Sequence, residues 1–313
     1  MKRFIIKILL WLLPIIVLAV STEFLLRQIP NDYSYKKNYL DKHSEKIQIL
    51  ILGSSNSVYG INPAFFSQRA FNAGNVSQTL NFDYKIFNKY KDKFNDLRVI
   101  IIPISYPALW SKLETGVESW RVNNYTIYYG MNPNALSDYS EFLTHSLSIN
   151  FKRLYKYYFE KENDIFCSEL GWESVYISGY YFGHDLEKNG IKALSQAADI
   201  HSEGAMKVFA ENMQVLNSFE EFCIRKNIKL IFLTTPAYHS FRENLNMEQF
   251  NKVVDTMNDI VAKHSNCYYL NCIEDPDFTK EDYYDADHLN GCGAEKLSKK
   301  LALYVDSLMI SNK

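Results

Sequence analysis

The sequence has few cysteines, and they follow no metal-binding or redox pattern. Five cysteines are scattered over 313 residues, and none forms a Cys-x-x-Cys pair. A zinc site or a thioredoxin-type site is therefore not expected, and we predict neither a metal nor another cofactor. Most of the cysteines should pack as small buried hydrophobic residues. Cys267 and Cys272 could pair in an exported compartment, and the odd total would still leave at least one thiol free.

An excess of charge of one sign is also missing. The chain has 34 Lys and Arg against 36 Asp and Glu, which gives a formal net charge of −2. Without a basic excess, nucleic acid is not an expected partner. No internal repeat is visible, and no Gly/Ser/Pro-rich linker flanks the segment of residues 108 to about 200. The length suffices for one large α/β domain, and the sequence leaves the oligomeric state open.

The N-terminus predicts a membrane anchor. A basic start is followed by the uncharged apolar run Ile8 to Val20. A helix from Phe4 to Thr22 would be about 28 Å long at ~1.5 Å per residue, close to the thickness of a bilayer core. The basic residues before it favour a cytoplasmic N-terminus and an extracytoplasmic body, as in a single-pass protein of a bacterial-type cell membrane.

A cleaved signal peptide is the alternative for this segment. Ala19-Val20-Ser21 offers small residues at the spacing of a cleavage site. Apolar residues continue beyond it to Leu26, so we favour an uncleaved anchor over residues 1–26. Residues 27–45 are polar and are interpreted as a stalk, which leaves residues 46–313 for the main domain.

The main domain shows the alternation of an α/β fold. Short apolar segments predict strands near residues 47–52, 69–75, 98–104, 228–234 and 268–272. Helical spacing follows at residues 77–95, 203–227, 247–264 and 294–309. This order predicts a doubly wound parallel sheet in a three-layer sandwich. Residues of about 108–200 break the rhythm, are rich in aromatic residues, and are expected to form an insertion over the strand ends.

A serine follows the first predicted strand. The run Ile47–Leu52 stops at Gly53, and Ser55 lies in the serine-rich turn after it. Ligands bind at the carboxyl ends of the strands in open α/β sheets, so Ser55 is a candidate nucleophile. The local pattern alone favours a serine-rich turn that caps the next helix.

Asp285 and His288 supply the partners that such a serine needs. Serine becomes nucleophilic at neutral pH when a base takes its proton and a third group orients the base. The two residues are three apart, a spacing that brings two side chains to one side of a helical turn or tight loop. The alternative is a helix N-cap beside a solvated histidine.

Three sequence blocks resemble the SGNH (GDSL) hydrolase family. Gly53-Ser54-Ser55-Asn56-Ser57 is similar to the first block, with Ser54 in place of the usual aspartate. Asn72-Ala73-Gly74 is similar to the second block, and Asp285-Ala286-Asp287-His288 resembles the last one. The resemblance is closest to the membrane-anchored, envelope-facing branch. It implies the catalytic residues Ser55, Asp285 and His288, with the backbone N–H groups of Ser55 and Gly74 in the oxyanion hole.

The third family block departs from the pattern. Where the family has Gly-x-Asn-Asp, this chain has Pro103-Ile104-Ser105-Tyr106, so the asparagine amide of the oxyanion hole is missing. The loss of one oxyanion donor costs about 2.7–4 kcal/mol of transition-state stabilisation where it has been measured. Ser105 or Asn75 could replace it; otherwise activity would be low or absent.

Further residues are candidates for substrate binding: Asn75, Tyr106, Trp120, Arg121 and His239. Trp120-Arg121 could hold an anionic or sugar substrate, or could be a packed tryptophan beside an exposed arginine. His239 could reach the same pocket from the loop after the strand at 228–234, although a surface position is the simpler interpretation.

These features predict an extracytoplasmic, membrane-tethered serine esterase or O-acyltransferase. The expected substrate is an acyl ester of an envelope polysaccharide, with acetyl as the expected group. One alternative is a catalytically inactive protein of the same fold that binds glycan or an assembly partner. Another is a lipid hydrolase at the bilayer surface.

Overall fold

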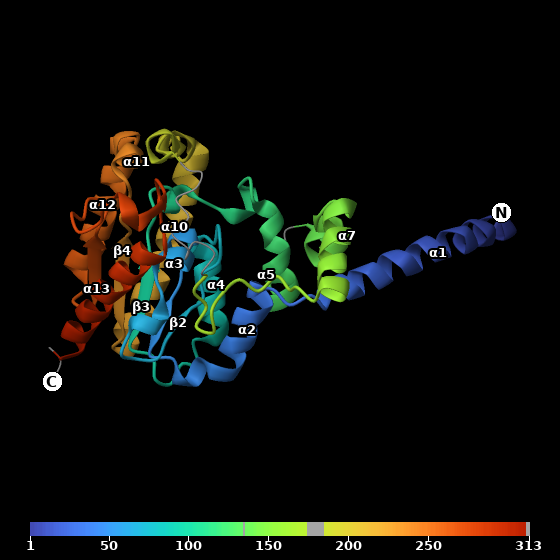
Figure 1. The fold of residues 1–313 in the computed structure, drawn as a ribbon, viewed down its shortest axis with the longest axis horizontal. Helices are drawn as coiled ribbons and strands as arrows, with labels where there is room; N and C mark the ends of the chain where they lie inside the picture. Colours follow the sequence, from blue (N-terminus) through green and yellow to red (C-terminus); the bar gives the residue numbers. More distant parts are fainter. Residues whose placement is uncertain (134, 174–184, 311–313) are drawn as a thin grey trace. The chain divides into compact units, whose positions relative to one another are not determined.

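The computed structural model describes residues 1–133, 135–173 and 185–310. Contacts divide the chain into two compact units (Figure 1). The first unit comprises Met1–Lys37 and Val117–Ile165, and the second comprises Asn38–Gly116 and Phe166–Lys313. The segment expected as one insertion, residues 108–200, is therefore distributed over both units.

A parallel five-stranded sheet forms the centre of the second unit. Its strands are β1 (Ile49–Ile51), β2 (Ala70–Asn72), β3 (Val99–Pro103), β4 (Lys229–Thr234) and β5 (Cys267–Asn271). They pair in the order β2-β1-β3-β4-β5. This order belongs to the doubly wound class and changes direction between β1 and β3, where such folds bind ligands. The predicted α/β class is confirmed.

Helices flank this sheet along its length. They are α3 (Ser55–Gly60), α4 (Leu80–Tyr90), α8 (Leu186–Asn189), α9 (Lys192–Ser195), α10 (Glu203–Lys226), α11 (His239–Glu243), α12 (Met247–Lys263) and α13 (Gly291–Ile310). Short 3₁₀ turns occur at Ser44–Lys46, Pro63–Phe65, Ala108–Trp110, Leu113–Thr115 and Lys280–Asp282. Ile49 and Ile101 pack in one apolar cluster with Leu297 of α13. Because side chains alternate along a strand, Leu50 and Ile100 face the other way.

A small hairpin precedes α13. Its strands are β6 (Tyr283–Asp285) and β7 (His288–Leu289), which pair antiparallel with Asp285 opposite His288. The spacing of these two residues was compatible with a helical turn or a tight loop, and the structure has the tight loop.

The start of α4 differs from the sequence prediction. Helical spacing began at Ser77, whereas the helix begins at Leu80. Ser77 has a φ angle of 59°, in the left-handed region, so it cannot be part of the helix.

Part of the predicted stalk is folded. Residues 32–43 form helix α2 (Asp32–His43), whose C-terminal half belongs to the second unit. There Leu40 is fully buried, and the ring of Tyr39 stacks on Phe71 at 4.0 Å. A polar composition suggested a linker, but Tyr39 and Leu40 pack against the second unit, and Asp41 accepts a hydrogen bond from the hydroxyl of Tyr90 at 2.8 Å.

The cysteines form no disulfide in the structure, and all five are free thiols. Cys267 begins β5 and Cys272 follows its end. Five residues along a strand span about 16 Å, far more than the ~7 Å limit between Cα atoms of a disulfide. The pairing considered for these two cysteines is therefore excluded by the strand between them.

The first unit is helical. It contains α1 (Lys2–Arg27), α5 (Val122–Tyr129), α6 (Glu141–Thr144), α7 (Leu147–Tyr155) and the start of α2, with 3₁₀ turns at Ser119–Arg121 and Leu136–Tyr139 and a π turn at Lys156–Glu160. Within α1, the stretch Leu10–Arg27 is long and apolar enough to cross a membrane. Its 18 residues span about 27 Å at ~1.5 Å per residue.

Candidate active site

The turn after β1 places Ser55 at the carboxyl edge of the sheet. Gly53 has a φ angle of +108°, and a Cβ atom there would lie 3.1 Å from Pro103 Cδ. Glycine is therefore needed for the chain to leave the strand so sharply. Ser55 then begins helix α3, half-buried beside the ends of β1 and β3.

The structure brings Ser55, His288 and Asp285 together. Ser55 Oγ lies 2.8 Å from His288 Nε2. The other imidazole nitrogen, Nδ1, lies 2.9 and 3.0 Å from the two carboxylate oxygens of Asp285. Hydroxyl, imidazole and carboxylate thus form one continuous hydrogen-bonded row across 233 positions of sequence.

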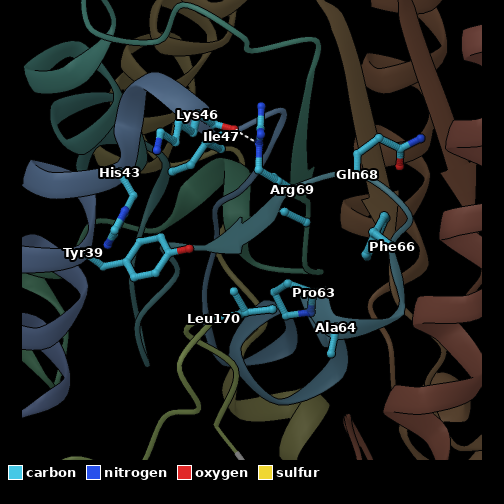
Figure 2. A pocket seen from close by; sticks show the side chains of 11 residues that line it. Tyr39, His43, Lys46, Ile47, Pro63, Ala64, Phe66, Gln68, Arg69 and Leu170 are labelled. Atoms are coloured by element: carbon cyan, nitrogen blue, oxygen red, sulfur yellow. Dashed lines mark hydrogen bonds between the residues drawn. The ribbon is translucent and has the colours of Figure 1, made fainter.

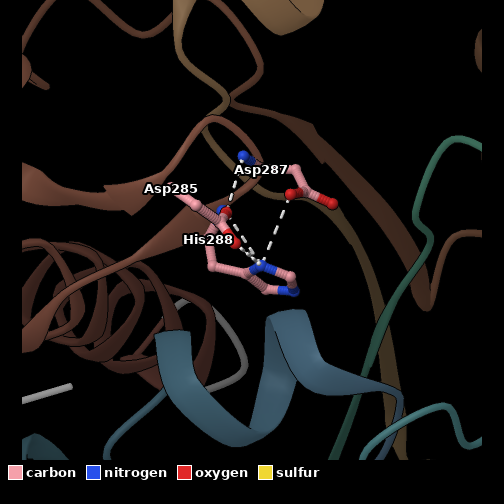
Figure 3. Close-up of side chains that lie close together, drawn as sticks. All are labelled: Asp285, Asp287 and His288. Carbon is pink, nitrogen blue, oxygen red and sulfur yellow. Dashed lines mark hydrogen bonds and ion pairs between the residues drawn. The ribbon is translucent and has the colours of Figure 1, made fainter. Parts of the chain in front are cut away.

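The hairpin loop itself holds the carboxylate in position (Figure 3). Asp285 Oδ1 accepts the backbone N–H of Asp287 at 3.1 Å and that of His288 at 2.9 Å. A carboxylate that accepts two backbone N–H groups of its own loop has little freedom to rotate. The orientation of the imidazole is therefore determined by four consecutive residues.

A lysine lies on the far side of the carboxylates. Lys192 Nζ is 3.1 Å from Asp285 Oδ2 and 2.6 Å from Asp287 Oδ1. Gln196, one helical turn further on, donates to Asp287 Oδ2 at 3.1 Å. Asp287, interpreted from sequence as a solvated or cap residue, is instead buried and paired.

These charges act on the imidazole in opposite directions. Burial lowers the pKa of His288, but the carboxylates of Asp287 and Asp285 outweigh it, so the pKa is raised above the usual value. Lys192 acts against the two carboxylates and lowers the pKa. Burial alone would raise the pKa of Asp285, whereas its bonds to His288 and Lys192 hold it well below the usual range.

Asp285, Asp287 and His288 are also close enough to one another to offer three ligands to a metal ion. The ammonium of Lys192 already lies within ion-pair distance of both carboxylates. A divalent cation at this point would have to displace that ammonium or lie against it. The donor set therefore fits an internal ion pair better than a metal centre.

The predicted oxyanion donor Gly74 is used elsewhere in this structure. Its backbone N–H donates to the side-chain oxygen of Asn72 at 3.0 Å. The amide nitrogen of Asn72 in turn donates to the carbonyls of Ser57 and Ile61 at 2.9 and 3.0 Å. Asn72 thus fastens the end of α3 to β2, and the N–H of Gly74 takes part in that arrangement.

Asn75 belongs to a buried polar row under the Gly53 turn. Its amide nitrogen donates to Gln78 Oε1 at 2.7 Å, and Gln78 Nε2 donates to Asp83 Oδ1 at 2.6 Å. The same oxygen of Asp83 accepts the N–H of Gly53 at 2.7 Å. Burial raises the pKa of Asp83 to about 7. Asn75 is therefore linked to the Gly53 turn through Gln78 and Asp83, and its amide group is directed at Gln78.

The hydrogen bonds of Tyr106 and His239 go to residues other than Ser55, His288 and Asp285. The hydroxyl of Tyr106 accepts the N–H of Asn246 at 3.0 Å. Its buried ring packs edge-on against the ring of Phe241, with 6.4 Å between the ring centres. His239 is exposed on α11, where its nitrogens pair with Glu187 and Glu243. These contacts give Tyr106 a packing role and His239 a surface position. Ser105 is half-buried in the loop after β3.

Trp120 and Arg121 belong to the first unit. The guanidinium of Arg121 lies 4.4 Å from the centre of the Trp120 ring and pairs with Glu118 at 2.9 Å. The pair is built as a cation–π contact. Its use in substrate binding stays a prediction.

Several residues that shape the site were not predicted. Lys192 lies in the irregular part of the sequence, and nothing in its neighbours marks it as a partner of Asp285. Asn56 anchors α3 to the hairpin, since its amide donates to the carbonyl of Asp287 at 2.8 Å. The Asp-x-Asp spacing of Asp285 and Asp287 beside a histidine was the one local signal for a denser charge cluster.

A separate cavity of about 270 Å³ lies at the opposite edge of the sheet (Figure 2). Lys46 and Ile47 precede β1, and Arg69 precedes β2, so these lining residues mark the amino ends of the strands. Arg69 is held by the carbonyl of Lys46 and by Asp96, both at 2.7 Å. This cavity is distinct from the Ser55 site.

The fold and site together define an α/β protein with a serine–histidine–aspartate row at the carboxyl edge of its sheet. No protein-family model and no curated protein matches the chain. Among solved structures, the chain is similar to a candidate platelet activating factor from Streptococcus pneumonia, with a TM-score of 0.44, 11% identity and coverage of 92% of this chain and 98% of that one. It is also similar to a candidate acylhydrolase from Bacteroides fragilis NCTC 9343, with a TM-score of 0.38, 11% identity and coverage of 86% and 96%.

Proposed function

We propose that the chain is a serine esterase or O-acyltransferase of the SGNH type, tethered to the membrane by α1 and acting outside the cytoplasm. The proposed substrate is an acyl ester, with acetyl as the expected group, on an envelope polysaccharide. The observation that carries the proposal is the hydrogen-bonded row from Ser55 Oγ through His288 to Asp285. The resemblance of the sequence blocks supports it, and the apolar α1 supports the tether.

In the proposed mechanism, Ser55 Oγ attacks the ester carbonyl while His288 Nε2 takes the hydroxyl proton. The carbonyl electron pair moves to the oxygen, giving a tetrahedral oxyanion. When this collapses, the C–O bond to the sugar breaks, and His288 returns the proton to the leaving alkoxide. Asp285 stays ionised and holds Nδ1–H, which stabilises the imidazolium formed in between. Water or a second sugar hydroxyl then attacks the acyl-serine by the same steps.

The backbone N–H of Gly74 already donates to Asn72, so other groups must donate hydrogen bonds to the oxyanion. Ser55 begins α3, so its own backbone N–H is among the unpaired groups of a helix start. The hydroxyl of Ser105, on the neighbouring strand end, is the second proposed donor. For the N–H of Gly74 to contribute, it would have to share or leave its bond to Asn72.

Chromogenic ester hydrolysis by the full chain in detergent or nanodiscs tests the chemistry. We expect turnover in the wild type and, in Ser55→Ala, a loss on the order of 10⁴-fold or more in kcat. Ser54→Ala is the matched control, because Ser54 makes no side-chain cap bond and should keep its activity. Equal turnover in Ser55→Ala and wild type would refute the assignment.

Mass spectrometry after exposure to acetylated envelope glycan separates hydrolase from transferase. An acyl adduct on Ser55 that is released by water alone indicates an esterase. An adduct that persists until a glycan acceptor is added indicates a transferase.

The second candidate is an inactive glycan-binding protein of the same fold. The missing third-block asparagine and the occupied N–H of Gly74 favour it, because both reduce oxyanion stabilisation. Glycan binding that persists in His288→Ala, with no turnover by the wild type, would decide for this function.

A further inference from the structure

Helix α7 in the first unit has its polar side inward and its apolar side outward. Asn150 is buried, and its amide donates to the carbonyls of Phe142 and His145. Arg153 points to the same interior and pairs with buried Glu141 at 2.9 Å and with Asp164 at 3.1 Å. A helix in a water-soluble body normally has the reverse arrangement.

The outward side of α7 carries large apolar side chains. Leu147, Phe151 and Tyr155 recur every four residues, so they share one side of the helix. Phe151 is 68% exposed and Phe159 is 75% exposed, and the Phe159 ring stacks on Tyr155. We call the exposed large apolar side chains of this segment the collar face, which consists of Leu136, Tyr139, Leu143, Leu147, Ile149, Phe151, Tyr155 and Phe159.

The segment that carries the collar face is fastened to the end of α1. The carboxylate of Glu23 accepts the N–H of Phe142 at 2.9 Å, that of Glu141 at 3.2 Å and the hydroxyl of Ser140 at 2.8 Å. The hydroxyl of Tyr158 donates to the carbonyl of Leu25. Figure 1 shows α7 beside the C-terminal end of α1, within the same unit.

The length of α1 indicates the depth at which these contacts would lie in a bilayer. The apolar stretch that begins at Leu10 spans about 27 Å before it ends at Arg27. A hydrocarbon core is about 30 Å thick, so a spanning α1 places residues 23–27 at the boundary between acyl chains and headgroups. The collar face therefore begins at that boundary.

We propose that the collar face is inserted into the outer-leaflet interface of the membrane that α1 spans. The partner is the phospholipid surface itself, contacted by an apolar patch with two tyrosines among its members. The inference rests on the proposed membrane tether and adds a second contact to it. A single helix lets a domain swing freely, whereas a helix with an inserted collar limits its tilt.

Charge does not contribute to this insertion. Residues 135–165 contain four basic side chains and five acidic ones, namely Lys152, Arg153, Lys156 and Lys161 against Asp138, Glu141, Glu160, Glu162 and Asp164. With a net charge of −1, the segment gains nothing from an anionic surface. Insertion should therefore be as strong in zwitterionic bilayers as in anionic ones.

Photo-crosslinking of the full chain in nanodiscs tests the proposal. The photoreactive residue p-benzoylphenylalanine is placed at Phe151, at Phe159, at Leu18 of α1 as the positive control, and at exposed Leu303 of α13 for comparison. The bilayers contain phosphatidylcholine alone or phosphatidylcholine with phosphatidylglycerol. We expect lipid adducts at Phe151 and Phe159 at yields within threefold of Leu18, at least tenfold above Leu303, and equal in both bilayers.

The outcomes distinguish insertion of the collar face from anchoring of the chain by α1. Lipid adducts at Leu18 with none at Phe151 or Phe159 would overturn the collar alone. Absence of adducts at Leu18 as well would overturn both. Crosslinks from Phe151 to a second copy, or to the second unit of the same chain, would show that protein covers the collar face. Ester turnover is measured separately and does not enter this result.

Discussion

Helices α12 and α7 have similar amphipathic spacing and bury opposite sides. In α12, Val253 and Met257 are fully buried in the second unit. In α7, the residues of comparable spacing are exposed, and Asn150 is buried instead. The comparison shows that periodicity identifies an apolar side but does not say whether protein or lipid covers it.

Two buried carboxylates, Glu141 and Asp83, also differ in what their oxygens are bonded to. Glu141 in the first unit pairs with the guanidinium of Arg153. Asp83 in the second unit accepts hydrogen bonds from the neutral donors Gly53 N–H and Gln78 Nε2. Charge is compensated in the first case, whereas in the second the energetic cost of ionisation is not offset by a cation.

Replacing Asp83 tests that difference and should give the largest effect. The pKa of Asp83 is raised from 3.8 to about 7, so between these values the unfolded chain has released a proton that the folded chain retains. The contribution of Asp83 to the free energy of unfolding is fully present below pH 3.8, the pKa in the unfolded chain. It is lost as the pH rises to about 7, the pKa in the folded chain. At 1.36 kcal/mol per pKa unit, the loss is about 4 kcal/mol, and Asp83→Asn should abolish it.

Urea unfolding at pH 4 and pH 8 measures this effect. We expect Asp83→Asn to be more stable than wild type at pH 8 and to lose far less stability between the two values. Asp255→Asn, an exposed change on α12, is the control. Parallel loss of stability in Asp83→Asn and wild type would show that Asp83 is already ionised in the folded chain.

Shortening one apolar side chain on each helix compares how much α12 and α7 contribute to stability. Met257→Ala should lower the free energy of unfolding by about 3 kcal/mol, because it leaves a cavity in a packed core. Phe151→Ala removes a larger side chain and should change it by less than about 0.5 kcal/mol, because that ring is exposed. Both are measured by urea unfolding of the full chain in one short-chain detergent. A loss of more than about 2 kcal/mol in Phe151→Ala would mean that protein covers α7.

Replacing Lys192 should give the smallest effect, on the pH dependence of catalysis. His288 faces Ser55, Asp285 and Asp287, lies near the ring of Tyr59, and has Lys192 behind the carboxylates. Lys192→Met removes the one cation of this group, so the pKa of His288 should rise further. Because the base must be neutral, the acid limb of kcat/KM should move up by about one pH unit, a tenfold loss on that limb.

Lys192→Arg is the matched variant and should keep the wild-type profile, since it retains the charge. A lower plateau with an unchanged apparent pKa in Lys192→Met would instead assign Lys192 a purely structural role.

Much of the fold followed from local patterns. Apolar runs such as Ile47–Leu52 and Arg98–Ile104 predicted buried strands because a parallel strand is covered on both faces. The final block placed Asp285 and His288 together because a three-residue spacing in a tight loop leaves few other arrangements. Elements without such patterns were missed: α2 is polar along its length and is attached by only a few side chains.

The parts of the site that depend on contacts across the fold could not be predicted. Gly74 was expected to serve the oxyanion, but its N–H meets Asn72, whose rotamer is set by the carbonyls of α3. Lys192 reaches Asp285 from a segment with no regular pattern. Neither contact produces a periodic pattern in the sequence from which it could be predicted.

The sequence by itself determined the α/β class, the strand positions and the candidate residues Ser55, Asp285 and His288. The class and the strands depend on side-chain periodicity, whereas the three candidate residues were joined by the resemblance of their sequence blocks to the SGNH family. Only the tertiary structure decided which donors are occupied, which carboxylates meet a cation and which way α7 faces. Those outcomes depend on groups brought together from distant parts of the chain, where burial and distance set the energy of each contact.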